Sequence, residues 1–281
     1  MDIICTVEEL RQWSRNLRGQ GKTIGLVPTM GALHAGHASL IRAAVASCDA
    51  VAVSIFVNPT QFGPSEDYDR YPRSFEADYV LAQVEGADLV FTPSVEELYP
   101  NGPGSTFVDL PALSQRLDGH SRPGHFRGVT TVVAKLLIAA EPDSAFFGQK
   151  DAAQVAILRR MVADLRLATE IVVCPIVREL DGLALSSRNQ YLSPDERAQA
   201  LTLSRAIHEV EMLFLTGEHH AAALIAAARQ ILAAEPAVLV DYVEVVDWST
   251  LEPLEEATPG SLFAVAAWVG STRLIDNTIL N

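Results

Sequence analysis

Hydrophobic and polar positions alternate along the first 177 residues in a way that predicts strands and helices in turn. Short apolar, often β-branched runs read as buried strands at 23–27, 50–57, 87–91, 144–147 and 171–177. Segments between them carry apolar residues at helical spacing, at about 6–19, 38–48, 75–85, 130–140 and 152–165. This alternation predicts an α/β fold, a Rossmann-like parallel sheet with helices on both faces.

The pattern changes after Ile176, where long helical segments are followed by strands. A capping box at Ser193-Pro194-Asp195-Glu196 begins a helix to about Leu215, and a second helix is expected from His219 to Ala234. Strands are expected at 238–246, 261–269 and 273–275. We therefore expect two domains, residues 1–175 and a smaller α+β domain of residues 176–281.

Composition narrows the class of partner. The chain has 281 residues and a formal net charge of −14, so a nucleic acid or an anionic membrane is not an expected partner. The three cysteines show no framework or metal spacing, and no apolar run reaches the ~18 residues of a membrane span. With no signal-type apolar core at the N-terminus, these features predict a cytoplasmic protein.

The stretch Pro28 to His37 lies where the first predicted strand of this region turns into a helix. Such a junction offers free backbone N–H groups and the positive end of a helix dipole, which suit an anion. If both lie on the helix, His34 and His37 share one face and add N–H donors. Two histidines three apart are also compatible with plain surface residues or with half of a metal site, which would need further ligands.

Two later loops have similar chemistry. Lys150, one of only three lysines in the chain, lies at the start of a predicted helix, where it opposes the dipole unless an anion sits beside it. We expect Asp151 to cap that helix. Ser186, Ser187 and Arg188 follow a glycine-containing turn and could cradle a phosphate, although an ordinary inter-domain loop would have the same composition. Because strand ends meet at one sheet edge, the loops at 28–37, 148–151 and 185–188 together predict an ATP site.

Another polar loop, Asn58 to Gly63, follows the strand at 50–57. Gln61 in this loop carries donors and an acceptor, so it could bind a hydroxyl or a carboxylate, although the loop taken alone favours an ordinary turn. Asp78 is expected to be a solvated helix carboxylate, with a metal ligand as the alternative. We rank His125 and Arg127 low as pocket residues, and residues 93–111 read as a loop that could include a lid.

The stretch Pro28 to His37 resembles the His-x-Gly-His signature of the nucleotidyltransferase superfamily that includes class I aminoacyl-tRNA synthetases. Over nearly its whole length the chain resembles the pantoate–β-alanine ligase family. Matching blocks are Phe56 to Phe62, Phe126 to Val133, Phe147 to Gln154 and Arg178 to Asn189. Two departures are Ala153, where a second Gln is usual, and Leu185, where Met is common; the second change is near-isosteric.

The resemblance implies a homodimeric, AMP-forming ligase that uses ATP and Mg²⁺ to join pantoate to β-alanine through a pantoyl adenylate. It assigns His34, His37, Lys150 and Arg188 as catalytic, and Gln61 and Gln154 as contacts for pantoate and β-alanine. ATP contacts are implied for Met30, Gly31, Ala32, Leu33, His34, Ala35, Gly36, His37, Gly148, Gln149, Lys150, Asp151, Val177, Leu185, Ser186, Ser187 and Arg188. The protein ligands of Mg²⁺ are not predicted, because the metal is expected largely on phosphate oxygens and water.

Two other functions are compatible with an anion site of this kind. One is a nucleotidyltransferase that leaves the nucleotide on its product, and the glutamine pair with AMP as product would distinguish the ligase from it. The other is a non-catalytic nucleotide-binding protein, against which the intact set of His34, His37, Lys150 and Arg188 argues.

Overall fold

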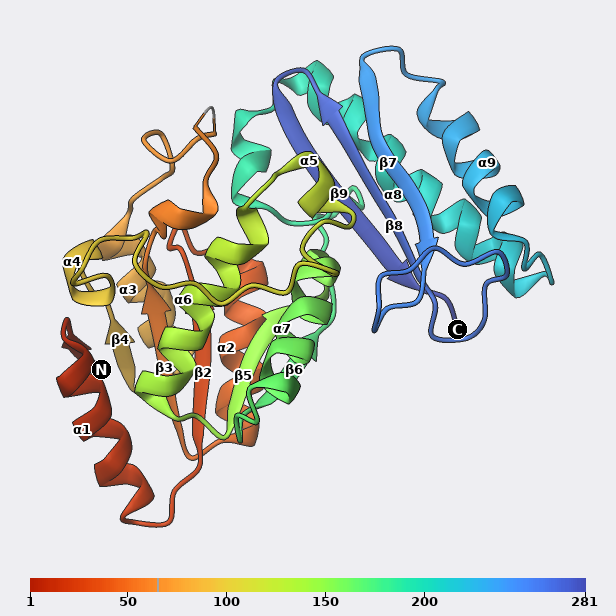
Figure 1. Ribbon diagram of the computed structural model, residues 1–281. Helices are drawn as coiled ribbons and strands as arrows, with labels where there is room; N and C mark the ends of the chain where they lie inside the picture. Colours follow the sequence, from red (N-terminus) through yellow and green to blue (C-terminus); the bar gives the residue numbers. More distant parts are fainter. Residues whose placement is uncertain (65) are drawn as a thin grey trace.

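The computed structural model describes residues 1–64 and 66–281. Two parts with separate sheets lie side by side in Figure 1: the N-terminal part holds β1–β6, and the C-terminal part holds β7–β9. A polar interface joins them along β9. This agrees with the fold class expected from the sequence.

The larger sheet is parallel throughout, with strand order β1-β4-β3-β2-β5-β6. Its strands are β1 (Asp2–Ile4), β2 (Ile24–Thr29), β3 (Ala50–Ile55), β4 (Leu89–Phe91), β5 (Ser144–Gly148) and β6 (Glu170–Cys174). The order runs outward in opposite directions from the β2–β5 pair, so the crevice at the carboxyl ends of these two strands is a topological switch point. A ligand is expected there.

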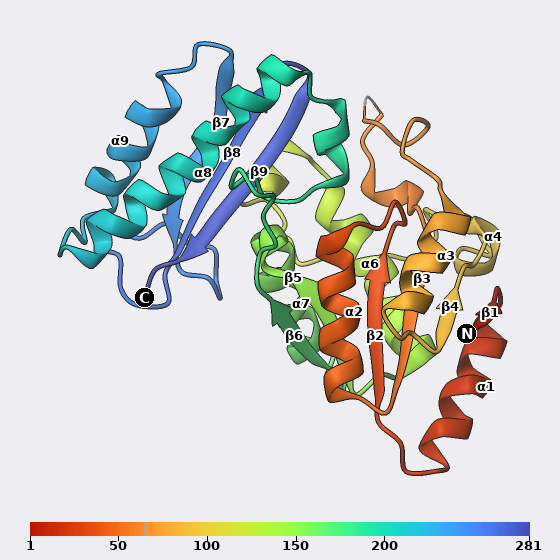
Figure 2. The same cartoon turned by 180° about the vertical axis from the view of Figure 1, so that it is seen from behind.

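Helices cover both faces of this sheet (Figures 1 and 2). On one face α1 (Val7–Arg18), α6 (His125–Ala140) and α7 (Ala152–Asp164) contribute to one apolar core cluster. On the other face α2 (Ala35–Ser47) and α3 (Phe75–Val84) pack in a second cluster. Short helical segments occur at α4 (Val95–Leu98), α5 (Asp118–Ser121), η1 (Pro59–Gln61), η2 (Gln149–Asp151) and η3 (Ser187–Tyr191).

The smaller sheet is antiparallel, with the order β7 (Val238–Val246), β8 (Leu262–Val269) and β9 (Thr272–Ile279). The helices α8 (Pro194–Leu215) and α9 (Ala221–Leu232) pack against it and share an apolar core with it. Other side chains of β7 and β8 cluster with α7, including Val246, Leu262 and Ile157. The small sheet therefore packs between its own helices, α8 and α9, and the N-terminal part of the chain.

Local signals account for most element ends. The predicted capping boxes at Thr6–Glu9 and Ser193–Glu196 both form, and α1 and α8 begin directly after Thr6 and Ser193. Strand β6 ends at Cys174, directly before Pro175, because proline lacks the N–H that a ladder needs.

The structure differs from the sequence-based expectations in four elements. Strand β1 was not expected, because three residues with one partly buried side chain leave little pattern. Helix α6 begins five residues before the expected Thr130, and the loop at 93–111 contains α4. Strand β9 runs to Ile279 instead of Ile275, because Asp276 and Asn277 are polar residues that are nonetheless buried.

Candidate active site

A cavity lies at the carboxyl ends of β2 and β5, at the switch point of the sheet, and its wall includes all three predicted phosphate loops. The polar lining residues are His34, His37, Gln61, Tyr71, Arg122, His125, Lys150, Asp151, Gln154, Ser186, Ser187 and Arg188. Apolar residues from α6, including Val129, Val132 and Val133, form another part of the wall. The wall of the cavity is therefore polar and charged in one part and apolar in another.

The turn before α2 is held by a buried carboxylate. Gly31 and Ala32 both have positive φ, at 80° and 49°, and this kink brings two backbone N–H groups to Asp78. Ala32 N donates to Oδ2 of Asp78 at 2.9 Å, and Leu33 N donates to Oδ1 at 2.7 Å. Asp78 is 2% exposed, so the expectation of a solvated carboxylate is wrong. Its oxygens are committed to the turn, which explains why an acid is tolerated at a buried helix position.

His34 and His37 do not share a helix face as expected, because His34 is the N-cap of α2 with extended backbone. Their rings nevertheless lie together, with centroids 4.2 Å apart. The Nδ1 atom of His34 accepts from Gly36 N at 3.1 Å, and Nδ1 of His37 accepts from His34 N at 3.3 Å. Since both Nδ1 atoms accept, each neutral ring carries its proton on Nε2 as a free donor.

Both histidines are neutral near pH 7. Burial, with a smaller contribution from the positive charge of Lys150, lowers the pKa of His34 to about 4. Burial and the neighbouring His34 ring lower the pKa of His37 to about 3. The formal positive charge on this side of the cavity therefore comes from Lys150 and Arg188, and the imidazoles contribute donors without charge.

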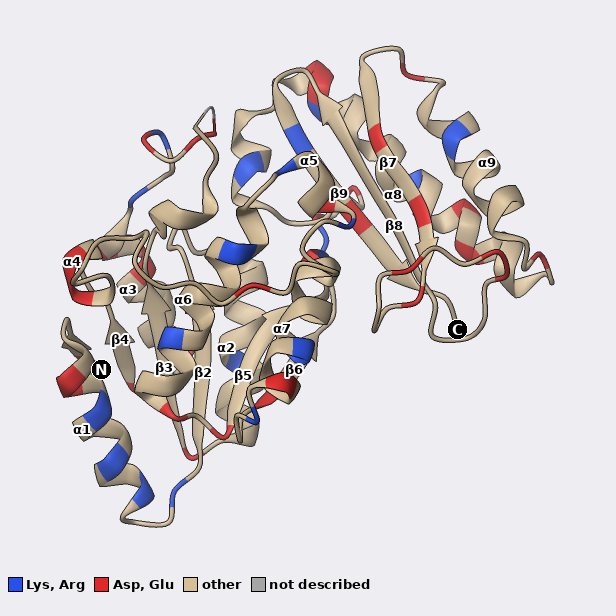
Figure 3. Ribbon diagram, viewed as in Figure 1, with Lys and Arg blue, Asp and Glu red and all other residues tan. Residues whose placement is uncertain are grey.

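The two cations are paired with carboxylates. Lys150 Nζ lies 3.0 Å from Oδ1 of Asp151, and Arg188 donates to Asp67 at 3.0 and 3.3 Å. Asp151 makes no side-chain hydrogen bond as the N-cap of α7, so the expected capping role is not found. Figure 3 shows basic and acidic segments close together in the region between the two sheets.

Two neutral amide side chains, Gln61 and Gln154, also line the cavity. Gln61 is 9% exposed, and its Oε1 accepts from Asn58 Nδ2 at 3.1 Å. Gly128 of α6 packs directly on this segment, and a Cβ there would lie 2.3 Å from the Thr60 carbonyl oxygen. Gln154 also lines the cavity and lies in α7, within the helix expected at 152–165. A rigid helix therefore carries one glutamine, and a segment clamped by α6 carries the other.

The structure places the predicted ATP residues unevenly. The lining includes Met30, His34, Gly36, His37, Gly148, Lys150, Asp151, Val177, Leu185, Ser186, Ser187 and Arg188. It does not include Gly31, Ala32, Leu33, Ala35 or Gln149. The first three belong to the turn held by Thr29 and Asp78, and the Gln149 amide instead contacts Asn277.

Three lining residues were missed or ranked too low from the sequence. His125 lines the cavity with its Nδ1 2.7 Å from the Gln61 carbonyl oxygen, and burial lowers its pKa to about 4. Arg122 makes two 2.7 Å hydrogen bonds to Glu66, and Tyr71 is 6% exposed. Arg122 and His125 are two basic residues shortly before the helix expected at 130–140, and this pattern could have identified them as pocket residues. Arg127, by contrast, is exposed and lies over the Phe107 ring.

A parallel sheet with a polar cavity at its switch point is the arrangement of nucleotide-binding α/β proteins. Comparison with known proteins is more specific. A family model described as pantoate-beta-alanine ligase matches residues 2–279. The chain belongs to the pantoate–beta-alanine ligase family.

Individual relatives match the chain over nearly its full length. The chain is 56% identical over 280 residues to a pantothenate synthetase of Koribacter versatilis, covering 100% of this chain and 96% of the relative. A pantothenate synthetase crystal structure from Thermus thermophilus superposes with a TM-score of 0.93 at 44% identity, covering 99% of each chain. A Francisella tularensis ligase structure, described as complexed with beta-gamma ATP and beta-alanine, has a TM-score of 0.76 at 33% identity and covers 99% and 97%.

Proposed function

We propose that this chain is an ATP-dependent, AMP-forming ligase that condenses pantoate with β-alanine to give pantothenate, and that the cavity is its active site. The observation that carries this proposal is the meeting of three sequence-distant loops in one cavity with two glutamines. Family membership supplies the substrates, and the loop chemistry supplies a place for a triphosphate.

The reaction has two balanced steps. A carboxylate oxygen of pantoate attacks the α-phosphorus of ATP, the bond to the β-phosphate oxygen breaks, and pyrophosphate leaves with pantoyl adenylate formed. The amine of β-alanine then attacks the acyl carbon and loses a proton, and AMP leaves as the acyl carbon–oxygen bond of this mixed anhydride breaks. Neither step needs a covalent enzyme nucleophile, so positioning and charge stabilisation are the catalytic contributions.

On the phosphate side, Lys150 and Arg188 supply positive charge, and the Nε2 donors of His34 and His37 supply hydrogen bonds. Ser186 and Ser187 add hydroxyl donors from the same loop as Arg188. A bound triphosphate would compete with Asp151 and Asp67 for the two cations, because each cation already has a carboxylate within 3.3 Å. We assign a phosphate-stabilising role to His37 in preference to a proton-donating one, since its low pKa leaves it uncharged.

In the same cavity, Gln61 and Gln154 contact pantoate, and Gln61 lies next to the β-alanine position. A primary amide can donate to a carboxylate and accept from a hydroxyl, and pantoate has both groups. The burial of Gln61 and its bond to Asn58 fix the direction of its amide.

Mg²⁺ is proposed as a companion of ATP. Within residues 1–64 and 66–281, no group of three or more His, Cys, Asp or Glu side chains is placed to hold a metal ion. We expect the ion to be held largely by phosphate oxygens and water, and Asp151, 44% exposed in its side chain, is a carboxylate of the cavity lining. The ion would neutralise phosphate charge during the first step.

We propose three further features because the chain resembles this family. The chain divides at residues 175 and 176, with the smaller part closing over the ATP site. The protein acts as a homodimer, and it is cytoplasmic. In the described part of the chain, no helix is both long and apolar enough to cross a bilayer.

A pyrophosphate-release assay tests the function. We expect release from ATP only when pantoate is present, and AMP with pantothenate once β-alanine is added. Release of a product that keeps the nucleotide would identify a nucleotidyltransferase of another kind. Binding of ATP without any release would identify a non-catalytic nucleotide-binding protein.

A further inference from the structure

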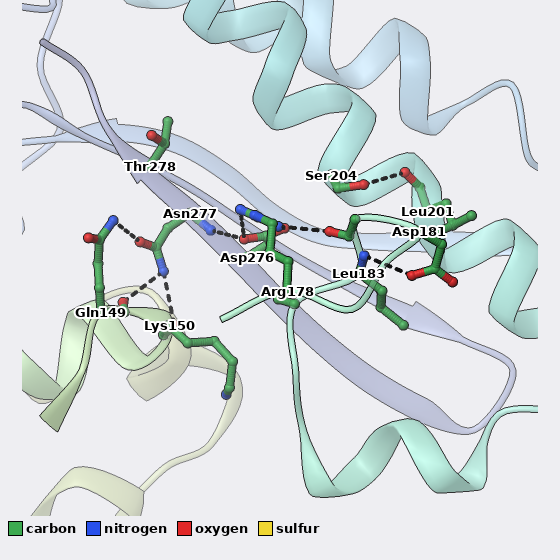
Figure 4. A network of polar contacts seen from close by, with 12 residues as sticks. Gln149, Lys150, Arg178, Asp181, Leu183, Leu201, Ser204, Asp276, Asn277 and Thr278 are labelled. Carbon is green, nitrogen blue, oxygen red and sulfur yellow. Dashed lines mark hydrogen bonds and ion pairs between the residues drawn. The ribbon is translucent and has the colours of Figure 1, made fainter. Parts of the chain in front are cut away.

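The three-residue segment η2, which carries Lys150, is held from outside by the small C-terminal sheet. Asn277 of β9 donates from Nδ2 to the carbonyl oxygens of Gln149 and Lys150, at 3.0 and 2.9 Å. Its Oδ1 accepts from Gln149 Nε2 at 3.3 Å. Figure 4 shows these contacts, with the Lys150 side chain directed away from Asn277.

This support matters because the segment has little of its own. Neither η2 nor the start of α7 has a side-chain capping hydrogen bond. Two consecutive peptide carbonyls fixed by one amide define the orientation of the peptide planes on both sides of Lys150. The direction of the Lys150 Cα–Cβ bond then follows from the backbone, which restricts the rotamers open to the side chain.

The side-chain amide of Asn277 is committed to this contact. The residue is 3% exposed, and both its amide hydrogens and its carbonyl are used at this contact. A buried amide costs free energy unless it is satisfied, so the two segments are held in one relative position. The neighbouring residue acts on a second site loop: Asp276 accepts from Arg178 at 2.6 and 3.0 Å, seven residues before Leu185.

We propose that Asn277 is a positioning residue for the ligase reaction: it fixes the backbone of Gln149 and Lys150 so that the Lys150 ammonium meets the phosphates of ATP. The inference rests on the phosphate role proposed for Lys150. It links the docking of the small sheet to ATP use, because β9 and η2 belong to different parts of the chain.

The test is a double-mutant cycle in the full-length protein, with Lys150→Ala, Asn277→Ala and both changes together. Asn277→Ala should lower kcat/KM for ATP by about tenfold to a hundredfold, the cost of a misplaced reacting group. The KM for pantoate should stay within about twofold, since Asn277 contacts η2 and neither Gln61 nor Gln154. Adding Asn277→Ala to Lys150→Ala should cause no further loss.

A matched control lies one residue away. Thr278 is also buried in β9, but its Oγ1 donates to Glu211 of α8 at 2.6 Å. Thr278→Val should lower the melting temperature and leave the kinetics of ATP use unchanged. If Asn277→Ala fails to fold by circular dichroism, Asn277→Ser takes its place under the same criteria.

Each outcome has a defined meaning. Unchanged ATP kinetics in folded Asn277→Ala, an additive loss in the double variant, or the same loss in Thr278→Val would overturn the positioning role. A Lys150→Ala variant with normal kinetics would instead overturn the phosphate role of Lys150 on which the inference rests. Loss in both single variants without additivity supports the proposal.

Discussion

The phosphate side and the pantoate side proposed for the cavity hold their polar groups in different ways. On the phosphate side, Lys150 and Arg188 are 22% and 29% exposed in their side chains, and each is paired with a carboxylate. On the pantoate side, Gln61 is neutral, 9% exposed and fixed by Asn58. The first arrangement allows an ion to exchange one anionic partner for another. The second presents a fixed amide that discriminates by hydrogen bonding.

This contrast gives the two sides separate kinetic signatures. Ion pairs near a solvated cavity respond to salt and to the charge of the ligand, so the phosphate side should govern ATP use. A buried amide is left unsatisfied by an analogue that lacks its partner group, so the glutamine side should govern the choice of acid. The following variants are expected to separate these properties.

The largest effect is expected for Lys150→Ala. Removing this cation should reduce kcat/KM for ATP by roughly 10²- to 10³-fold, the range for a group that stabilises developing charge. Lys22→Ala removes an exposed lysine outside the cavity lining and should leave activity unchanged. Steady-state kinetics with melting temperatures checks both. Normal kinetics in Lys150→Ala would show that this lysine is only structural.

His37→Ala should reduce turnover by roughly 10²-fold, because one preorganised donor to the phosphates is lost. His34→Ala should behave similarly, although it also removes the side-chain N-cap of α2. Circular dichroism should show both variants folded, and adenylate formation should be measured by pyrophosphate release. Near-normal adenylate formation in folded His37→Ala would remove the histidine from the mechanism.

Gln61→Ala and Gln154→Ala should act on the other side of the cavity. Each should raise the KM for pantoate by at least about tenfold while leaving the KM for ATP within about twofold, as one lost polar contact to a bound hydroxyl or carboxylate would do. Each should also discriminate less well against a pantoate analogue lacking one hydroxyl. Gln12→Ala, on the exposed face of α1, is the control. Equal losses for ATP and pantoate would contradict the division between the two sides.

The smallest effect is a pH dependence of stability without ligands. His34 and His37 have folded pKa values of about 4 and 3, below the unfolded value of 6.5. The unfolded chain therefore binds more protons below about pH 6.5, so the stability contributed by neutral histidines is complete above 6.5 and declines as pH falls toward these values. Melting temperature measured from pH 8 to 4.5 should fall less in His37→Asn. An identical decline in the variant would argue against a neutral, buried His37.

The sequence predicted the parallel sheet, the capping boxes and the convergence of three loops, because apolar periodicity and chain punctuation are local properties. It did not predict that Asp78 holds the turn of Ala32 and Leu33, since a helix carboxylate looks the same whether it is solvated or bonded to a distant backbone. The same limit applies to Asn277, whose partners lie 127 and 128 residues away. Long-range polar contacts leave no period in the sequence.

The arrangement of His34 and His37 illustrates the intermediate case. Their spacing correctly predicted that the two side chains lie together. The expected shared helix face was wrong, because His34 lies before the helix as its N-cap. Residue type and the position of loops directly after predicted strands indicated much of the cavity wall, whereas the exact backbone conformation of each residue depended on neighbours outside the local sequence.

We propose that one cavity binds the phosphates of ATP on one side and pantoate on the other. The most direct measurement is pyrophosphate release by Lys150→Ala and Gln61→Ala, each titrated with ATP at saturating pantoate and with pantoate at saturating ATP. We expect Lys150→Ala to impair the ATP titration and Gln61→Ala to impair the pantoate titration. The same loss in both titrations for both variants would contradict this proposal.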